Sequence, residues 1–260
     1  MTTSSRLEAD DLTLGYGHCT IVSHFSVTLP DHALTAIIGP NGSGKSTVLR
    51  ALARLLPPKH GQVCLDGTPL TTLATQQIAR TLGVLPQSPR IPEAITVEAL
   101  VARGRHPHRR AFSAWHPRDE QAVHDAMAMT GVSELAQQPV DTLSGGQRQR
   151  AWIAMVLAQQ TSLLLLDEPT TWLDIAHQID VLNLLRTLTH THGRTLVAVL
   201  HDLNHACRYA DHLLVMKEGR LVAQGAPVAI MTPALVEDVF GLRCVMIDDP
   251  IAGTPIIVPC

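Results

Sequence analysis

The amino-acid sequence predicts an α/β fold: a mostly parallel sheet covered by helices, with an N-terminal antiparallel β subdomain and a helical insertion subdomain. Three observations predict it. Apolar residues alternate near the N-terminus, apolar strands then alternate with segments of helical spacing, and strand patterns are missing from about residue 89 to 139. No internal repeat is found, so the 260 residues are expected to form one such unit with a substantial core.

The N-terminal part is expected to contain five strands and one helix. Alternating apolar residues predict antiparallel strands that end at Tyr16 and begin again at Ile21, with a glycine-containing turn between them. A helix is expected to begin at Ser46 and to run to about Leu55, because two prolines follow. The other strands are expected at 34–38, 61–65 and 83–85.

The insertion and the C-terminal part complete the predicted fold. Apolar spacing predicts two helices in the insertion, around 97–101 and 123–129. Beyond the insertion, strands are expected at 163–166 and 195–200, and helices from about 145, at 175–190 and at 203–209. We therefore predict a core formed by residues 1–88 and 140–260, and a helical subdomain at about 89–139.

Composition narrows the classes of function. The formal net charge of −3 argues against nucleic-acid binding, because such proteins usually carry a basic excess. No apolar run approaches the roughly 20 residues that span a bilayer, and the N-terminus lacks the apolar region of a signal peptide. Any membrane role is therefore expected to depend on partners. The five cysteines are scattered, which favours reduced cytosolic thiols.

A glycine-rich segment lies between a predicted strand and a predicted helix. It fits G-x-x-x-x-G-K-[ST], the phosphate-binding loop of nucleoside triphosphatases. Lys45 is expected to reach the β- and γ-phosphates of ATP, and the Ser46 hydroxyl is expected to bind Mg²⁺. The predicted nucleotide-binding residues here are Gly39, Pro40, Asn41, Gly42, Ser43, Gly44, Lys45, Ser46 and Thr47. The loop by itself leaves kinases, GTPases and motors open.

Two adjacent acids follow the apolar strand at 163–166. Two carboxylates side by side repel each other unless a cation is present, so a polar end to the strand explains only one of them. Together with the phosphate-binding loop, Asp167 is expected to face Mg²⁺ and Glu168 to polarise the attacking water.

A second glycine-containing loop narrows the class further. Residues 143–147 read Leu-Ser-Gly-Gly-Gln and precede a predicted helix, which predicts a second anion site. Its residues are Ser144, Gly145, Gly146 and Gln147. Carried by the helical insertion, this loop cannot easily close on its own chain's ATP. Two copies arranged head to tail would bring it to the γ-phosphate held by the other copy's Lys45.

Over nearly its whole length the sequence resembles the ATP-binding subunits of ABC transporters, whose signature is Leu-Ser-Gly-Gly-Gln. The resemblance implies an ABC ATPase fold and ATP hydrolysis. It implies that Tyr16 stacks on adenine, for which packing in the core is the alternative, and that Gln87 contacts Mg²⁺ or water. It also implies that Asp174 reaches the opposite subunit and that His201 contacts the γ-phosphate. Trp172 departs from the small residue that most relatives carry at that position.

Three further segments resemble the importers of ferric siderophores, haem and cobalamin, and iron–siderophore uptake is the expected activity within that group. The segments are 101–108, 171–178 and 249–255. The basic run from Arg103 to Arg110 is expected to be either a solvated face or a contact with a permease loop or lipid headgroups.

The resemblance also implies the partners: ATP and Mg²⁺, a second copy, two membrane permease subunits and, indirectly, a substrate-binding protein, at the cytoplasmic face of the membrane. A soluble ABC-type ATPase acting on ribosomes or DNA is the alternative. It fits less well, because only one cassette is present and no sustained heptads lie between Lys45 and Ser144. A kinase would leave the signature loop unexplained. A transition-metal site at His201 and His205 would lack a third ligand nearby in the sequence.

Overall fold

The computed structural model describes residues 5–87, 94–109 and 114–260, and the chain divides into two compact units. The first unit comprises residues 1–73, 166–168 and 185–260, and the second comprises 74–165 and 169–184. The predicted helical subdomain of about 89–139 falls within the second unit, whose bounds are wider. The division into a core and a helical subdomain stays a prediction.

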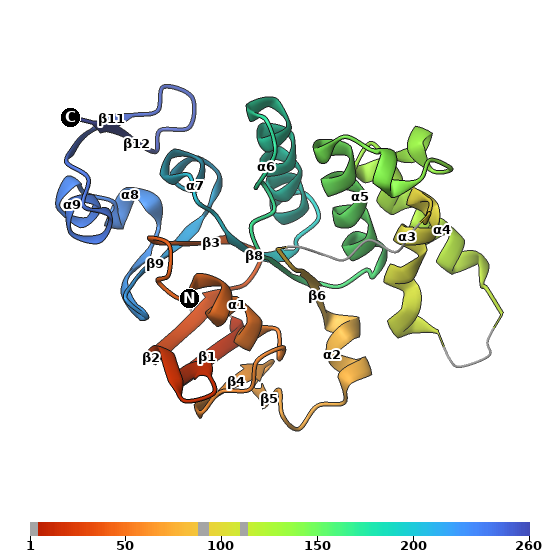
Figure 1. Ribbon diagram of the computed structural model, residues 1–260, viewed down its shortest axis with the longest axis horizontal. Helices are drawn as coiled ribbons and strands as arrows, with labels where there is room; N and C mark the ends of the chain where they lie inside the picture. Colours follow the sequence, from red (N-terminus) through yellow and green to blue (C-terminus); the bar gives the residue numbers. More distant parts are fainter. Residues whose placement is uncertain (1–4, 88–93, 110–113) are drawn as a thin grey trace. The chain divides into compact units, whose positions relative to one another are not determined.

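The first unit opens with a four-stranded antiparallel sheet (Figure 1). Side chains of the long second strand alternate between buried and exposed, because one face of the sheet covers the core. The first two strands pair as far as Tyr16 and Cys19, which confirms the predicted hairpin. In sheet order the strands are β2 (Cys19–Pro30), β1 (Ser5–Tyr16), β4 (His60–Leu65) and β5 (Thr68–Pro69).

A second sheet of the first unit holds the parallel strands. Strand β3 (Leu34–Ile38) pairs in parallel with β8 (Thr195–Val199) and with β9 (His212–Lys217), and β10 (Arg220–Gly225) is antiparallel to β9. Every residue of β3 and β8 is buried, as expected for strands covered on both faces. Because the carboxyl ends of parallel strands meet at one edge, the loops after β3 and β8 lie together there.

Helices follow both central strands of this sheet. Helix α1 (Lys45–Leu52) follows β3, and α7 (Leu203–Tyr209) follows β8. Helix α1 ends three residues before the predicted Leu55, because Arg54 takes a φ of 57° and Leu55 N donates to the carbonyl of Arg50. The elements after α7 were not predicted from the sequence: these are β9, β10, α8 (Pro227–Ile230), α9 (Pro233–Phe240), β11 (Cys244–Asp248) and β12 (Pro255–Pro259).

The second unit is mainly helical, and its helices α3, α4 and α5 pack against one another (Figure 1). The predicted helices and strands of this region are confirmed, and one further helix, α2, was not predicted. The helices and strands are α2 (Thr75–Thr81), β6 (Leu82–Leu85), α3 (Val97–Ala102), α4 (Pro117–Met129), α5 (Gly145–Ala158), β7 (Leu163–Leu166) and α6 (Ile175–His190), with 3₁₀ turns at Arg103–His108, Ser133–Leu135 and Val140–Thr142. Leu166 and residues 185–190 are counted with the first unit.

A buried ion pair in the second unit connects the 3₁₀ turn at Arg103–His108 with α4, and the same arginine also contacts the end of α5. Arg105 Nε donates to Asp119 Oδ1 over 2.8 Å, and Arg105 Nη1 donates to the carbonyl of Ala158 over 2.7 Å at the end of α5. Burial disfavours the charged carboxylate, but the hydrogen bond and the charge of Arg105 outweigh burial and hold the pKa of Asp119 below its ordinary value. The expectation that Arg105 lies on a solvated or partner-binding face is therefore wrong. Arg110 lies outside the described residues.

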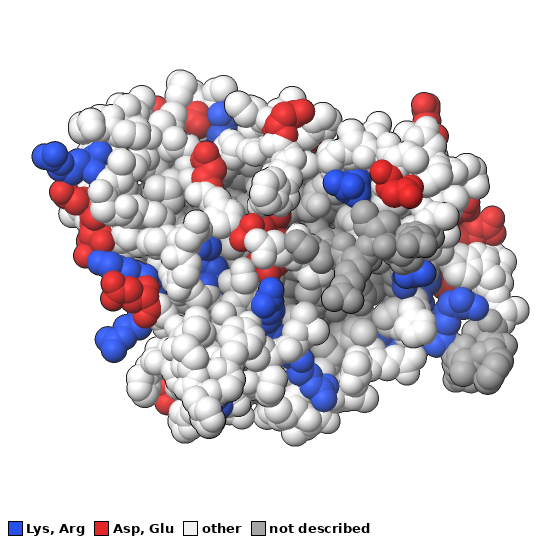
Figure 2. Space-filling view, viewed as in Figure 1, with Lys and Arg blue, Asp and Glu red and all other residues white. Residues whose placement is uncertain are grey.

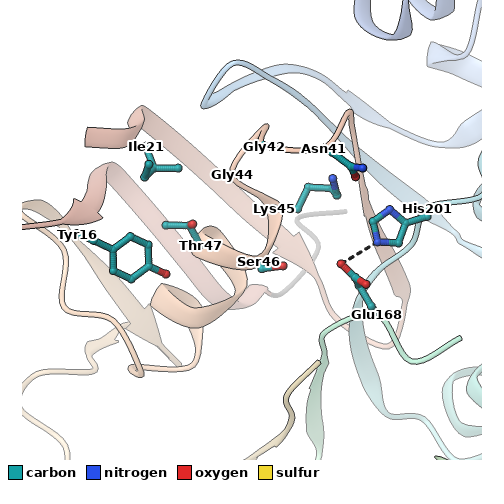
Figure 3. A pocket seen from close by; sticks show the side chains of 10 residues that line it. All are labelled: Tyr16, Ile21, Asn41, Gly42, Gly44, Lys45, Ser46, Thr47, Glu168 and His201. Carbon is teal, nitrogen blue, oxygen red and sulfur yellow. Dashed lines mark ion pairs between the residues drawn. The ribbon is translucent and has the colours of Figure 1, made fainter. Parts of the chain in front are cut away.

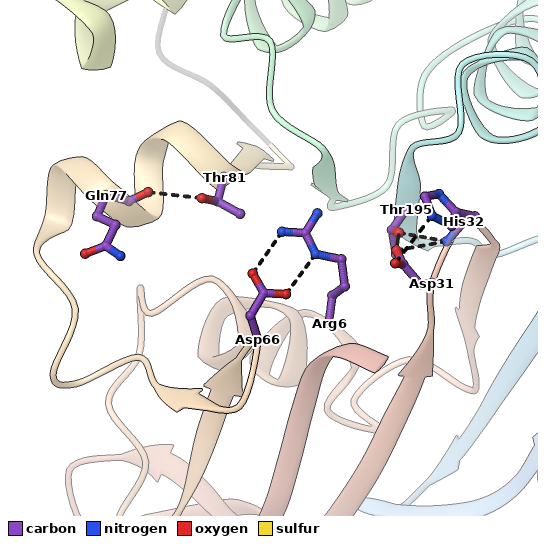
Figure 4. Close-up of polar contacts among 7 residues, drawn as sticks. All are labelled: Arg6, Asp31, His32, Asp66, Gln77, Thr81 and Thr195. Carbon is purple, nitrogen blue, oxygen red and sulfur yellow. Dashed lines mark hydrogen bonds and ion pairs between the residues drawn. The ribbon is translucent and has the colours of Figure 1, made fainter. Parts of the chain in front are cut away.

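Polar contacts near the ends of strands complete the framework (Figure 4). Arg6 donates from Nε and Nη2 to the two carboxylate oxygens of Asp66 over 2.8 and 2.9 Å. Before β3, Asp31 accepts hydrogen bonds from the Thr195 hydroxyl and from the N–H of His32. The hydrogen bond between Thr195 and Asp31 joins the beginning of β8 to the residues just before β3.

Helix length and polarity concern membrane spanning, and the distribution of surface charge concerns nucleic-acid binding. Within residues 5–87, 94–109 and 114–260, every helix is too short or too polar to cross a membrane. On the face shown in Figure 2, Lys and Arg side chains are scattered among acidic and uncharged residues. The described residues on that face therefore form no continuous basic surface.

Candidate functional site

The loop after β3 is shaped as a cradle that tolerates only glycine at key positions. Gly39, Gly42 and Gly44 take φ values of 154°, 79° and 95°. A Cβ on Gly39 would lie 2.2 Å from the carbonyl oxygen of Met216, and one on Gly44 would lie 2.7 Å from Val22. The loop can therefore turn its backbone N–H groups inward at the N-terminus of α1, where the helix dipole favours anions.

Lys45 is the cation of this cradle and is nearly buried. Its Nζ donates to the carbonyls of Gly39 and Pro40 over 2.8 and 2.9 Å. Burial lowers the pKa of Lys45, and the carboxylates of Glu168 and Asp167 oppose that shift. Phosphate oxygens can replace the two carbonyls as partners of the ammonium group. No described residue hydrogen-bonds the buried Ser43 hydroxyl in the same loop, which leaves a further donor for an anion.

The two adjacent acids contact different partners. Asp167 is buried, and its Oδ1 accepts a hydrogen bond from the Ser46 hydroxyl over 2.8 Å. Burial raises the pKa of Asp167, and the Ser46 hydrogen bond only partly offsets this. Glu168 Oε1 lies 2.8 Å from His201 Nε2. The neighbouring carboxylates can therefore serve two functions.

One pocket of about 270 Å³ is lined by several of these residues, namely Gly42, Gly44, Lys45, Ser46, Glu168 and His201 (Figure 3). Tyr16 lies at one end of it and is 47% exposed, so core packing does not account for this side chain. Its hydroxyl accepts a hydrogen bond from Arg50 Nη1 over 3.1 Å. Glu168 and His201 lie at the other end, beside Asn41 and Lys45 (Figure 3). The pocket thus joins an aromatic platform, a phosphate cradle and an acid–histidine pair.

Two oxygen groups beside the phosphate cradle have the chemistry that Mg²⁺ prefers. The Ser46 hydroxyl and the Asp167 carboxylate are hard donors held 2.8 Å apart beside the cradle. Among residues 5–87, 94–109 and 114–260, no group of three or more His, Cys, Asp and Glu side chains could hold a metal ion. His201 and His205 therefore have no third such ligand in the described chain.

The signature loop lies in the second unit and caps helix α5. The Ser144 hydroxyl accepts from the N–H of Gln147 over 3.2 Å, and Gln147 Oε1 accepts from the N–H of Ser144 over 3.1 Å. This capping box fixes the first turn, while Ser144 and Gly145 stay exposed. The exposed N-terminus of this 14-residue helix has a dipole that favours an anion, and the predicted anion site at this loop stays a prediction.

The segment around Asp174 supports the same helix end. Asp174 Oδ1 accepts from the N–H of His177 over 2.9 Å and lies 2.7 Å from its Nδ1. The hydrogen bond from the N–H of His177 lowers the pKa of Asp174. The His177 ring packs against Gly146, since a Cβ there would lie 2.7 Å from it. Trp172 is 90% exposed, with a φ of 67°.

His177 was not assigned a role from the sequence. A signal was available, because His177 lies three residues after Asp174 at the start of a predicted helix, and a capping aspartate accepts a hydrogen bond from the backbone N–H at that position. Gln87 lies in the second unit, two residues beyond β6, and is exposed directly before the segment 88–93 that is not described. Its predicted contact with Mg²⁺ stays a prediction. The predicted residues of the first unit thus lie at or beside the nucleotide pocket, and those of the second unit, except Gln87, lie at or beside the N-terminus of α5.

Comparison with known proteins agrees with this geometry. Residues 22–171 match the family described as ABC transporter. The chain is 59% identical to the ferric enterobactin transport ATP-binding protein of Escherichia coli (strain K12), over 98% of this chain and 94% of that protein. It is 51% identical to the achromobactin transport ATP-binding protein of Dickeya dadantii (strain 3937), over 96% and 93%.

Solved structures show the same fold. A chain of a metal-chelate type ABC transporter in an inward-facing conformation has a TM-score of 0.85 and 27% identity, over 99% of this chain and 98% of that one. A dimeric bacterial ABC transporter cassette has a TM-score of 0.76 and 25% identity, over 85% and 98%.

Proposed function

This chain belongs to the ABC transporter family as an ATP-binding, ATP-hydrolysing subunit, and from that premise we propose that it energises the import of an iron–siderophore complex. One observation carries the proposal: 59% identity, over 98% of the chain, to a subunit named for ferric enterobactin transport. The importer depends on separate membrane permease subunits, and the chain acts as a peripheral subunit at the cytoplasmic face of the membrane.

In the proposed reaction, Tyr16 stacks on adenine while the cradle and Lys45 bind the triphosphate. Glu168 accepts the proton of the water whose oxygen attacks the γ-phosphorus, and the bond to the β–γ bridging oxygen breaks. His201 donates to the γ-phosphate. Ser46 and Asp167 would hold Mg²⁺, which neutralises phosphate charge when bound. The products are ADP and phosphate.

We propose that competent hydrolysis needs two copies. The signature loop carries a helix N-terminus and a serine but no cation or carboxylate between Ser144 and Gln147, which supports its proposed role as one half of a shared site. In a head-to-tail dimer, Ser144 of one copy faces the γ-phosphate that Lys45 of the other copy binds. Asp174 lies beside this contact, and Gln87 reports the nucleotide state to the segment that follows it.

Trapping the closed dimer tests these roles. Glu168→Gln keeps the shape of the side chain and removes the base, so turnover should fall on the order of 10²–10⁴-fold while ATP still binds. With ATP and Mg²⁺ the variant should elute from a sizing column as a dimer. Lys45→Ala is the control and should stay monomeric under the same conditions. A Glu168→Gln variant that stayed monomeric, or kept near-normal turnover, would refute the proposal.

The cargo is tested by uptake. The chain is assembled with its permease pair and binding protein in proteoliposomes, and ATP-dependent uptake of a ferric catecholate, a ferric hydroxamate, haem and cobalamin is compared. We expect a ferric siderophore to be transported. Uptake of haem or cobalamin alone would contradict the cargo. Co-purification with ribosomes or DNA and without a membrane partner would contradict transport.

A further inference from the structure

The segment 249–255 comprises the turn of the C-terminal β11–β12 hairpin and the first residue of β12, and none of its residues lines the nucleotide pocket. Asp249 is buried, and its Oδ1 accepts from the N–H groups of Ile251 and Ala252 over 2.8 and 3.2 Å. Gly253 closes the turn with a φ of 66° and donates its N–H to the Asp249 carbonyl over 2.8 Å. The N–H of Ile251 holds the pKa of Asp249 below its ordinary value, so the carboxylate is charged at neutral pH.

The hairpin is attached to helix α7 at two points. The Asn204 side chain makes two hydrogen bonds with the backbone of β12. Its Oδ1 accepts from the N–H of Ile257 over 2.7 Å, and its Nδ2 donates to the carbonyl of Ile257 over 3.3 Å. Four residues later, Arg208 Nε lies 3.5 Å from Asp249 Oδ2. Residues four apart share one face of a helix, so the hairpin holds the first and last turns of α7 from the same side.

Helix α7 begins at Leu203, two residues after the histidine of the nucleotide pocket. Asp202 caps it by accepting from the N–H of His205 over 2.7 Å, and His201 is the residue before this cap. The His201 side chain is 43% exposed and pairs with Glu168 over 2.8 Å. Because little packing surrounds this ring, its place depends on the backbone that enters α7.

We propose that the β11–β12 hairpin braces α7 and so positions His201 for ATP hydrolysis, with Asn204 and Asp249 as positioning residues. This inference rests on the proposed role of His201 at the γ-phosphate. The phosphate cradle, which binds ATP, belongs to a different loop and does not contact the hairpin through Asn204 or Asp249. Loss of the brace therefore lowers kcat and leaves KM for ATP nearly unchanged.

The test is a double-mutant cycle on the full chain assembled with its permease pair. Asn204→Ala removes both hydrogen bonds at an exposed position, so the variant is expected to fold. Its kcat should fall roughly tenfold, below the hundredfold that an ångström of misplacement can cost. Asn204→Asp keeps the acceptor for Ile257 and should retain part of the lost rate. Ile251→Ala is the matched control, because this 81% exposed side chain lies on the same turn.

Coupling to His201 decides the matter. If Asn204 acts through His201, then Asn204→Ala should cause no further loss of kcat in a His201→Ala background. An equal tenfold loss in both backgrounds, or a kcat for Asn204→Ala equal to that of Ile251→Ala, would overturn the brace. If His201→Ala alone kept wild-type turnover, the proposed role of His201 would be wrong, and so would the brace. This result is distinct from an equal effect of Asn204→Ala in both backgrounds, which would contradict the brace alone.

Hydrogen exchange gives a second readout that does not depend on turnover. Asn204→Ala and Asp249→Asn should both speed amide exchange across 201–209, while exchange in α1 stays as in the wild type. Cys207 reports the same opening, since burial raises its pKa to about 12 and keeps the thiol unreactive until α7 moves. Unchanged exchange and unchanged thiol labelling in both variants would contradict the brace.

Discussion

A buried aspartate in the first unit and one in the second unit have pKa values that are shifted in opposite directions. Asp119 in the second unit has a resident cation, Arg105, which holds the pKa of the carboxyl below its ordinary value. Asp167 in the first unit has the neutral Ser46 hydroxyl as its direct partner, and burial raises its pKa. Burial disfavours charge at both sites, and only Asp119 is compensated by a direct ion pair within its own chain.

This difference in pKa shift indicates that the Asp119 carboxylate stabilises the fold, whereas the Asp167 carboxylate is expected to serve activity. Breaking the Asp119 pair leaves Arg105 buried without its carboxylate, so the cost falls on folding. Burial already disfavours the charged form of Asp167 in the folded chain, and a bound divalent cation would relieve this, so loss of the carboxylate is expected to lower activity. Substituting each aspartate by asparagine should therefore give opposite phenotypes.

The largest expected effect is on turnover. Asp167→Asn should lower ATP hydrolysis by roughly 100-fold, or about 2.7 kcal/mol in the barrier, because the carboxylate that we propose for Mg²⁺ is lost. Its free energy of unfolding without nucleotide should equal or exceed that of the wild type. Turnover assays and urea unfolding on the same preparations measure both. A stable protein with full activity would break the comparison at this site.

The next effect is on stability. Asp119→Asn should lower the free energy of unfolding by about 2–3 kcal/mol, because Arg105 loses its ionic partner and keeps only neutral acceptors such as the Ala158 carbonyl. ATP affinity, which belongs to the first unit, should stay within about twofold, or roughly 0.4 kcal/mol. Urea unfolding and nucleotide titration provide the measurements. Unchanged stability would show that the pair is dispensable.

The smallest effect is the pH dependence, which has opposite signs at the two sites. The lowered pKa of Asp119 adds stability above the unfolded value of about 3.9, and that stability is lost as pH falls through the folded pKa. The raised pKa of Asp167 adds stability at low pH that is lost as pH rises through the folded pKa.

Difference curves isolate these two contributions. The free energy of unfolding is measured from neutral pH down to about 3. The contribution of Asp167 to stability rises as pH falls, and Asp167→Asn should lack this rise. The contribution of Asp119 falls near and below the unfolded pKa of about 3.9, and Asp119→Asn should lack this fall. Curves for the two variants that run parallel to that of the wild type would remove the distinction between the sites.

The parts of the molecule that sequence predicts are those whose chemistry is local. The phosphate-binding loop, the adjacent acids and the signature loop are short continuous segments, and the structure gives each the predicted strand or helix context. Helix α2 was missed because it buries only Ile78 and so shows no apolar period. Strand β12 is short and bounded by prolines, which weakens a strand pattern.

The contacts that sequence could not predict join distant segments. Asn204 pairs with Ile257, 53 residues away, and nothing in the local pattern marks either as a partner. Arg105 looked like part of an exposed basic run, but tertiary packing buries it against Asp119. Such pairings follow from which elements pack together, which residue type and spacing alone do not specify.

The central claim, that two copies each supply half of every hydrolytic site, is tested most directly by mixing two inactive chains. A Lys45→Ala chain lacks the cradle cation, and a Ser144→Arg chain lacks a functional signature loop, so neither should hydrolyse ATP alone. In a mixed dimer one site carries both defects and the other carries none. An equal mixture should recover up to about a quarter of wild-type turnover, because half of the dimers are mixed and each has one intact site. If verified mixed dimers were as inactive as either chain alone, the shared-site account would be contradicted.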